Sequence, residues 1–352
     1  MVVSFLLRSG AIFIACVSIL LVVLEKQLPV QDSLSFEELP ESVQLWHKRG
    51  FYVKVFDHQM FVVQSGPTEV DEDVVVFFHG FPCSSFDYAK SLPYLMEDFP
   101  NKRLVFFDHL GFGFSDKPQS DYEYTLHDHA ENSLELLRQL KIKSAHIVAH
   151  DMGDSIVTEI LLRRHLKLLP DQFKDFFKSV TFTNGGMHFD SINMRLTQIL
   201  LNIPYFGSFF SSLNSKLPPQ ISGRLASKQL ASIWSPNANV VERDEDIEAI
   251  RALMMYKNGT RLNHKTCSYL QDRARFESRW YRALKKLDIP CMILWGDSDA
   301  VAPMEIPKHL AMNVIPAEKF NGKVMKDVGH FLMLEKPQEW SKTLSNFILK
   351  FK

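Results

Sequence analysis

The sequence has few cysteines and no excess of one charge. Its four cysteines among 352 residues show no metal-ligand spacing, and they predict neither a disulfide framework nor a zinc site: Cys16, Cys83, Cys267 and Cys291. Lys and Arg number 40 against 41 Asp and Glu, so the chain lacks the basic excess that nucleic-acid binding needs. We therefore expect no metal site and no nucleic-acid partner.

A phosphate-binding pattern is also missing. The glycine-rich stretch from Asp108 to Ser115 lacks the P-loop lysine and the spacing of a dinucleotide fingerprint, so no nucleotide is implied. No internal repeat or low-complexity tract occurs. The composition, with 46% hydrophobic and 23% charged residues, is typical of a globular chain with a large core.

One long apolar run is present near the start of the chain. Ala11 to Leu24 is uninterrupted and mostly apolar, and Val2 to Leu7 extends it on the other side of Arg8. The following Glu25-Lys26-Gln27 contains no small-x-small cleavage site. We expect a single-pass membrane anchor in residues 1–27, with a cytosolic N-terminus and a lumenal domain, because acidic residues follow the run and Arg8 precedes its main part.

Beyond the anchor, strand and helix patterns alternate along the chain. The expected strands are Phe51–Phe56, Gln59–Gln64, Val74–Phe78, Arg103–Phe107, Ala145–His150, Ser179–Thr183, Cys291–Trp295 and Gly322–Lys326. The expected helices include Ser84–Glu97, Thr125–Leu140, Asp154–His165 and Pro337–Phe351. This alternation predicts an α/β fold with a doubly wound, mostly parallel sheet.

The same patterns divide the chain into segments. Residues 28–50 form a linker or short helix, and residues 51–184 and 288–352 form the α/β core. Residues 185–287 contain helical patterns and no strong strand signal. We therefore expect them to form an inserted helical cap.

The most informative motif follows the expected strand Ala145–His150. There, the small residues Ala149 and Gly153 lie on either side of Asp151. A tight strand-to-helix turn holds its central residue in strained geometry, and bulky neighbours would collide there. The pattern predicts Asp151 on a nucleophile elbow. Because aspartate has a reference pKa of about 3.9, its ionised carboxylate can attack saturated carbon without help from a base.

The order of polar residues supports this interpretation. Sheets of this architecture carry a nucleophile, an acid and a histidine, in that order, at the carboxyl ends of successive strands. Asp297 and Asp299 follow the strand that ends at Trp295, and His330 follows the last strand. We predict His330 as a general base oriented by Asp299. Asp297 is an alternative, since either acid also suits a turn or a helix cap.

A further loop follows the strand Val74–Phe78. A simple turn is one interpretation of His79-Gly80-Phe81-Pro82, since glycine and proline occur in loops of many kinds. In this architecture, however, its place predicts that the backbone N–H groups of Phe81 and Met152 form an oxyanion hole.

Together these motifs resemble the epoxide hydrolase and haloalkane dehalogenase branch of the α/β-hydrolase superfamily. The resemblance spans Trp46 to Phe351 and rests on His79-Gly80-Phe81-Pro82, Asp108-x-x-Gly111-x-Gly113-x-Ser115-Asp116-Lys117-Pro118, His150-Asp151-x-Gly153, Trp295-Gly296-x-x-Asp299 and Gly329-His330. It implies the α/β-hydrolase fold. A narrower likeness, through Trp46-x-x-x-Gly50 and Asn184-Gly185-Gly186, implies a membrane hydrolase of the endoplasmic reticulum.

The resemblance also implies a mechanism. Asp151 would attack an alkyl carbon to form an alkyl-enzyme ester, and His330, paired with Asp299, would activate water against that ester. The oxyanion hole of Phe81 and Met152 would serve this second step, because the carbonyl being hydrolysed belongs to Asp151 itself. Such chemistry needs no metal and no organic cofactor.

Assistance to the leaving group separates the substrate classes. Tyr281 matches one of the two tyrosines that protonate an opening epoxide, although a packed interface tyrosine fits equally well. The second tyrosine has three candidates: Tyr205, Tyr256 and Tyr269. Phe81 and Met152 stand where dehalogenases often carry Asn and Trp, which donate N–H groups to the halide. Epoxide opening is therefore favoured over dehalogenation.

The remaining alternatives concern the substrate and the class of protein. Met152 and the nearby Phe81, Phe112 and Phe114 suggest an apolar, lipid-like small-molecule substrate. An acyl-ester hydrolase is disfavoured, since attack by Asp151 on an acyl carbon would give a reactive anhydride. A non-enzymatic binding protein on the same fold is also an alternative.

Overall fold

The computed structural model describes residues 34–120, 122–217 and 219–351. The anchor expected in residues 1–27 lies outside this part of the chain. Within the described part, none of the helices combines the length and the apolar character needed to cross a membrane.

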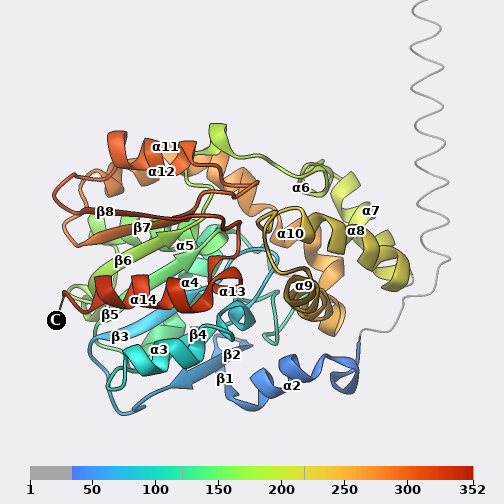
Figure 1. Ribbon diagram of the computed structural model, residues 1–352, viewed down its shortest axis with the longest axis horizontal. Helices are drawn as coiled ribbons and strands as arrows, with labels where there is room; N and C mark the ends of the chain where they lie inside the picture. Colours follow the sequence, from blue (N-terminus) through green and yellow to red (C-terminus); the bar gives the residue numbers. More distant parts are fainter. Residues whose placement is uncertain (1–33, 121, 218, 352) are drawn as a thin grey trace, which may run out of the picture.

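The described residues form a mixed sheet of eight strands in the order β1-β2-β4-β3-β5-β6-β7-β8 (Figure 1). The strands are β1 (Gly50–Val55), β2 (His58–Ser65), β3 (Val74–Phe78), β4 (Leu104–Phe107), β5 (Ala145–His150), β6 (Phe177–Thr183), β7 (Cys291–Gly296) and β8 (Phe320–Met325). β1 pairs antiparallel with β2, and β2 pairs antiparallel with β4. All later pairings are parallel, which confirms the predicted architecture.

The central strands are apolar on both faces because helices cover both. Val74, Val76 and Phe78 of β3 belong to one hydrophobic core, while Val75 and Phe77 belong to the other. This two-sided burial explains the continuous apolar runs of the sequence. The helices that flank the sheet or precede it are α2 (Glu41–Lys48), α3 (Leu92–Asp98), α4 (Leu126–Gln139), α5 (Met152–His165), α12 (Glu305–Asn313), α13 (Leu332–Glu335) and α14 (Pro337–Ile348).

Two helical segments differ from the sequence-based expectation. The expected helix Ser84–Glu97 is divided into the 3-10 turn η2 (Ser85–Tyr88) and α3, and Pro93 lies in the first turn of α3. Proline suits the first turn of a helix but lacks the N–H that a continuous helix needs. The helix before β8, α12, was not predicted; it contains Pro307 near its start.

The chain between β6 and β7 contains six further α-helices in its described residues. They are α6 (Leu196–Leu201), α7 (Phe206–Lys216), α8 (Pro219–Ala231), α9 (Val240–Met255), α10 (Asn263–Thr266) and α11 (Tyr269–Leu284). Short 3-10 turns complete the structure: η1 (Phe36–Glu38), η3 (Asp171–Phe173), η4 (Phe189–Ser191) and η5 (Tyr256–Leu262). In Figure 1, α6 to α10 lie together to the right of the sheet, and α11 lies above it.

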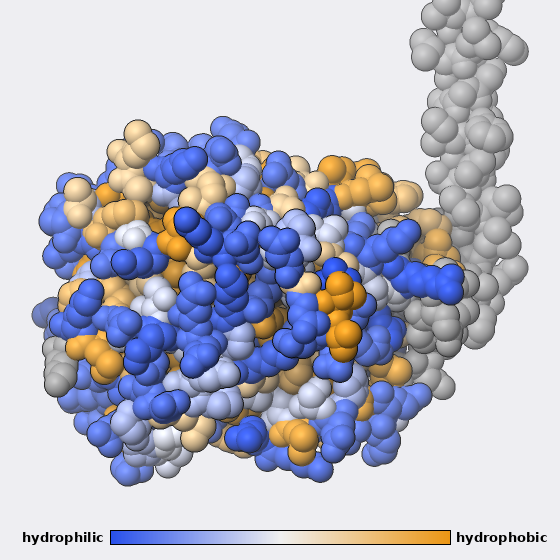
Figure 2. All heavy atoms as spheres, in the orientation of Figure 1, coloured by the Kyte–Doolittle hydropathy of each residue, from blue (hydrophilic) through white to orange (hydrophobic). Residues whose placement is uncertain are grey.

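The surface is mostly hydrophilic on the face that Figure 2 shows, with hydrophobic residues gathered over α6 and α7. The large apolar side chains exposed on these two helices and their connection are Leu196, Ile199, Ile203, Tyr205 and Phe206.

Candidate active site

Asp151 lies in the sharp turn between β5 and α5. Its backbone has φ 47° and ψ −108°, a strained conformation for a residue with a side chain. Close packing around this turn explains why glycine occupies the neighbouring positions 80 and 153. A Cβ atom on Gly153 would lie 2.7 Å from the Phe78 carbonyl oxygen, and one on Gly80 would lie 2.6 Å from the Asp151 Cβ.

The loop after β3 contacts the carboxylate directly. The backbone N–H of Phe81 donates to Asp151 Oδ2 at 3.0 Å. His79 supports this loop: its Nδ1–H donates to the Gly80 carbonyl at 2.9 Å, and its Nε2 accepts from the His109 N–H. Burial lowers the pKa of His79 to about 3, so its ring is neutral. Met152 opens α5, where its N–H has no acceptor within the helix.

His330 and Asp299 form a buried, hydrogen-bonded pair. His330 Nδ1–H donates to Asp299 Oδ2 at 2.8 Å, and Asn184 Nδ2–H donates to the same oxygen at 2.7 Å. The other oxygen, Oδ1, accepts the N–H groups of Val301 and Ala302. Asp297 instead accepts from Ser298 Oγ and the Asp327 N–H in an exposed turn. The structure therefore brings Asp299, and not Asp297, to the histidine.

The environment shifts the pKa values of His330 and Asp151 in opposite directions. Burial disfavours the imidazolium, but the charge and hydrogen bond of Asp299 outweigh it and raise the pKa of His330. Burial likewise disfavours the Asp151 carboxylate, yet Arg273, His330 and the Phe81 N–H together lower its pKa. Asp151 is therefore ionised at neutral pH.

Arg273, from α11, was not anticipated. Its Nη2 donates to the Asp151 backbone oxygen at 2.6 Å and lies 3.3 Å from Asp151 Oδ1, while its Nε donates to Ser155 Oγ at 2.8 Å. The guanidinium also packs over the Tyr269 ring at 4.6 Å. The sequence offered one hint, since Arg273 falls on the helix face whose other buried members are mostly apolar: Tyr269, Leu270, Trp280, Ala283 and Leu284.

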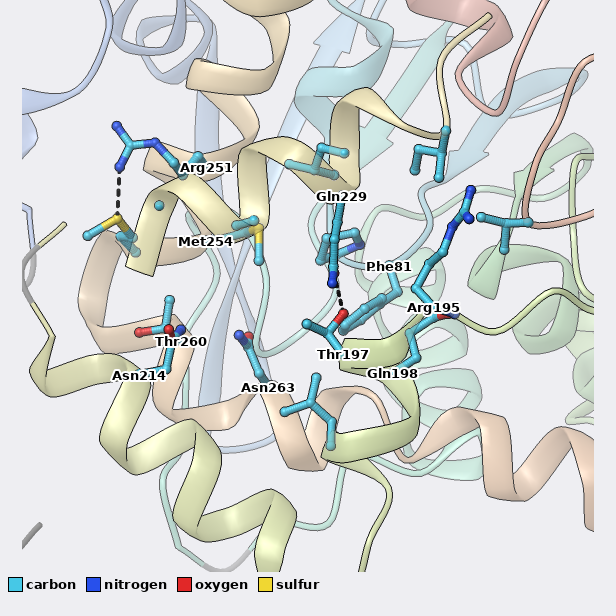
Figure 3. A pocket seen from close by; sticks show the side chains of 18 of the residues that line it. Phe81, Arg195, Thr197, Gln198, Asn214, Gln229, Arg251, Met254, Thr260 and Asn263 are labelled. Carbon is cyan, nitrogen blue, oxygen red and sulfur yellow. Dashed lines mark hydrogen bonds between the residues drawn. The ribbon is translucent and has the colours of Figure 1, made fainter. Parts of the chain in front are cut away.

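Asp151 and His330 both line a cavity that opens to solvent and lies between the sheet and the helices that follow β6; the empty space in and at the mouth of this cavity, open solvent included, is about 1020 Å³. The core also contributes Phe81, Pro82 and Val301. The apolar cap side chains that line it include Leu201, Phe210, Leu230, Ile233, Met254 and Met255. Figure 3 shows the polar Thr197, Gln198, Gln229 and Asn263 around the same space, with a hydrogen bond between Thr197 and Gln229.

The structure does not bring Tyr281 to the other predicted residues. Its hydroxyl lies 2.5 Å from Glu277 Oε1 and 2.7 Å from the Met187 carbonyl, and it is not among the residues that line the cavity. Tyr205 is 94% exposed. Tyr269 does not line the cavity either, but it is buried beside Phe81 and close enough to Asp151 for that charge to help burial raise its pKa.

The described residues contain no group of three or more His, Cys, Asp or Glu side chains arranged to hold a metal ion. Asp108, the first residue of the glycine-rich motif, has a structural role. It accepts the N–H groups of Ser85 and Phe114, and a Cβ atom on Gly113 would collide with its carboxylate.

The protein is similar to three curated relatives over most of its length. It shares 27% identity over 315 residues with the putative hydrolase LipZ of Mycobacterium tuberculosis, covering 88% of this chain and 98% of LipZ. It shares 27% identity over 321 residues with the mesoderm-specific transcript homolog protein of Bos taurus, covering 89% of this chain and 90% of that protein. Epoxide hydrolase 1 of Caenorhabditis elegans is 21% identical over 320 residues, covering 89% and 73%. These relatives confirm the resemblance indicated by the motifs.

A solved structure shows the same fold. The crystal structure of a putative ancestral haloalkane dehalogenase superposes with a TM-score of 0.67 at 20% identity, covering 85% of this chain and 98% of that one. Residues 73–337 match the α/β hydrolase fold family. The chain belongs to this family.

Proposed function

We propose that the protein is a hydrolase that forms an alkyl ester on Asp151 and then hydrolyses it, with an apolar epoxide as substrate. The observation that carries this proposal is the ionised Asp151 carboxylate at the cavity wall, with Oδ2 held by the Phe81 N–H. A carboxylate fixed in this way presents its second oxygen to a bound carbon atom. The hydrolase names of its relatives, an epoxide hydrolase among them, agree with this chemistry.

The second half-reaction uses the paired histidine. Because His330 Nδ1–H is donated to Asp299, Nε2 is the nitrogen left to take a proton from water. The resulting hydroxide attacks Asp151 Cγ. Negative charge then develops on Oδ2, and the Phe81 N–H that donates to this oxygen stabilises it. His150 keeps the base in place, since its Nε2–H donates to the His330 carbonyl at 3.0 Å.

Protonation of an opening epoxide requires an acid in the cap. Tyr269 suits this role better than Tyr281, because it lies beside Phe81, with ring centroids 5.6 Å apart, and near enough to Asp151 for that charge to affect its pKa. Burial, followed by the charge of Asp151, raises the pKa of its hydroxyl, so it remains protonated. We assign Tyr269 as the proton donor in this proposal.

The cavity wall supports a mostly apolar substrate. Aliphatic, thioether and aromatic side chains form about half of the lining, while the other half is polar and includes Arg195 and Arg251. We therefore propose a substrate that is mostly apolar and carries polar atoms.

We further propose that residues 1–27 anchor the protein in the endoplasmic reticulum membrane with this domain in the lumen. Protection of the domain from added protease in intact microsomes, lost after detergent, supports this topology; cleavage in intact microsomes overturns it.

The enzymatic proposal is tested with the His330→Gln variant. It is incubated with styrene oxide, decene oxide and bromodecane, and its intact mass and peptides are mapped. Since the variant lacks the base for ester hydrolysis, we expect an adduct on the peptide that contains Asp151, and none in the double variant with Asp151→Asn. An adduct from an epoxide supports epoxide opening, and one from bromodecane alone favours dehalogenation. Folded protein without any adduct overturns the proposal.

A further inference from the structure

Arg273 divides the two oxygens of the Asp151 carboxylate into different environments. Oδ2 accepts the backbone N–H of Phe81 at 3.0 Å, whereas Oδ1 lies 3.3 Å from the Arg273 guanidinium. With its side chain only 2% exposed, Arg273 is shielded from water. The guanidinium therefore has a persistent, weakly screened contact with one particular oxygen of the nucleophile.

The identity of that oxygen decides what Arg273 does. This inference rests on the proposed function, in which Oδ2 is the carbonyl oxygen of the ester and carries the negative charge during its hydrolysis. Oδ1 is then the oxygen that bonds to the substrate carbon. When the ester is hydrolysed, Oδ1 leaves with that carbon as an alkoxide, so negative charge develops on an oxygen that Arg273 touches.

We propose that Arg273 is a catalytic residue of ester hydrolysis, stabilising the alkoxide that leaves on Oδ1. Water gives a proton to His330, and the resulting hydroxide bonds to Cγ. The Cγ–Oδ1 bond then breaks, and its electron pair goes to Oδ1 beside Arg273. The alkoxide takes the proton from His330 and departs as an alcohol, while the oxygen from water remains in the Asp151 carboxyl group.

The charges at the buried site also favour a role for Arg273 in ester hydrolysis and not in alkylation. Alkylation neutralises Asp151 and leaves the Arg273 guanidinium without its anionic partner, which is costly for a buried charge. Asp154 does not replace that partner, because it forms no ion pair with Arg273: its Oδ1 accepts the Thr183 N–H and its Oδ2 has no hydrogen-bond partner, and burial raises its pKa well above the ordinary value. Hydrolysis restores the carboxylate, and with it the ion pair. The same pair makes Oδ1 a weaker nucleophile, so Arg273 gives no advantage to the first step.

Neighbouring side chains fix the guanidinium independently of the nucleophile. Nε donates to Ser155 Oγ at 2.8 Å, and the plane of the guanidinium packs over Tyr269 at 4.6 Å. Nη2 also donates to the Asp151 backbone oxygen, which alkylation does not alter. Arg273 therefore remains beside Oδ1 in the ester.

The test compares Arg273→Met and Arg273→Lys with wild type in single turnovers of styrene oxide, decene oxide and bromodecane. Quenched samples are analysed by mass spectrometry for the Asp151 adduct. In Arg273→Met we expect alkylation at the wild-type rate or faster, and hydrolysis slower by about a hundredfold, so that the adduct accumulates. Arg273→Lys, which keeps the charge, is expected to recover part of the hydrolysis rate. Arg275→Met removes an exposed charge from the same helix and serves as the matched control.

The outcomes separate this inference from the proposed function. If His330→Gln accumulates the adduct but Arg273→Met does not, or if Arg273→Met slows both steps equally, Arg273 has no specific part in hydrolysis and the inference is wrong. If no variant forms an adduct, the proposed function itself fails and the inference with it. Circular dichroism melting of each variant excludes unfolding as the cause, and Arg273→Lys provides the same comparison should Arg273→Met not fold.

Discussion

The protonation states of His330 and Asp151 follow from their immediate neighbours. Asp299 raises the pKa of His330 above its ordinary value of 6.5 against the effect of burial. The pKa of Asp151 is lowered from 3.8 despite its burial, through Arg273 first and then His330. As the pH falls, His330 therefore gains its proton before Asp151 does, and we expect His330 to set the acid limit of the proposed activity.

We predict that the rate of ester hydrolysis rises with pH through a single step above pH 6.5, where His330 loses its proton. In Asp299→Asn the opposing effect of burial dominates, so the step moves to lower pH and the plateau rate falls by about 10²–10⁴-fold. The control is Asp297→Asn, which lies in an exposed turn and is expected to change neither. The measurement is the decay of the Asp151 adduct against pH; an unmoved step in Asp299→Asn would contradict this assignment.

The two cap tyrosines are expected to respond differently to loss of their hydroxyl groups. Tyr269→Phe removes the proposed proton donor, so alkylation by decene oxide is expected to slow by at least about a hundredfold. Alkylation by bromodecane, whose leaving group needs no proton, is expected to change little if that compound is accepted. Tyr281→Phe, whose hydroxyl contacts Glu277 and Met187, is expected to leave epoxide opening unchanged. If Tyr281→Phe slows epoxide opening and Tyr269→Phe does not, Tyr281 is the proton donor.

The order along the chain predicted that Asp151, His330 and an acid after β7 come together, but it left Asp297 and Asp299 as alternatives for that acid, and the structure places Asp299 beside His330. Each follows a strand of a parallel sheet, and such strands end at one edge. Arg273 could not be predicted with the same assurance. Several arginines occur in α11, and only the packing of that helix against α5 decides which one reaches the nucleophile. Tyr281 matched a motif, but a motif does not fix where a cap side chain points.

The nucleophile elbow depends on close contact between β3, β5 and α5. Gly153→Ala would place a Cβ atom 2.7 Å from the Phe78 carbonyl oxygen, so the first turn of α5 must shift. We predict a loss of about 1–3 kcal/mol in the free energy of unfolding and a larger fractional loss of activity. Gly322→Ala serves as the control, because there the nearest atom, at 2.7 Å, belongs to the Phe320 side-chain ring, which is able to turn away, whereas the Phe78 carbonyl is fixed in the backbone. Denaturant unfolding measures both; equal stabilities would show that the turn tolerates a side chain.

Strands were predicted more closely than helices. β3 is a continuous apolar run, β5 is apolar apart from His146 and His150, and the expected bounds of both match those observed. The helix expected at Ser84–Glu97 was wrong in its continuity, since apolar residues can keep a helical spacing across a turn that interrupts the backbone. The cap was expected only as a helical region. Its helices pack against one another and the core, so their individual bounds depend on tertiary contacts.

Most residues that line the cavity lie in the chain between β6 and β7. In the same part of the chain, the Ile233 carbonyl accepts the His330 N–H at 2.8 Å, so this segment also helps to position His330. Met254, on α9, lines the cavity. We predict that Met254→Trp narrows it and lowers kcat/KM for decene oxide relative to styrene oxide by about tenfold or more. Leu349→Trp, on the exposed surface, is the control. Equal changes in kcat/KM for the two substrates would mean that Met254 does not contact the chain of decene oxide.

The most direct test of the covalent mechanism is a single turnover of decene oxide, or of whichever probe labels Asp151, in heavy-oxygen water with enzyme in excess. If Asp151 attacks the substrate carbon, the oxygen newly bonded to that carbon comes from the enzyme. The product is then unlabelled, and the heavy oxygen is found in the peptide that contains Asp151. Label in the product of the first turnover, with none in that peptide, would mean that water attacks the substrate directly and would contradict the account.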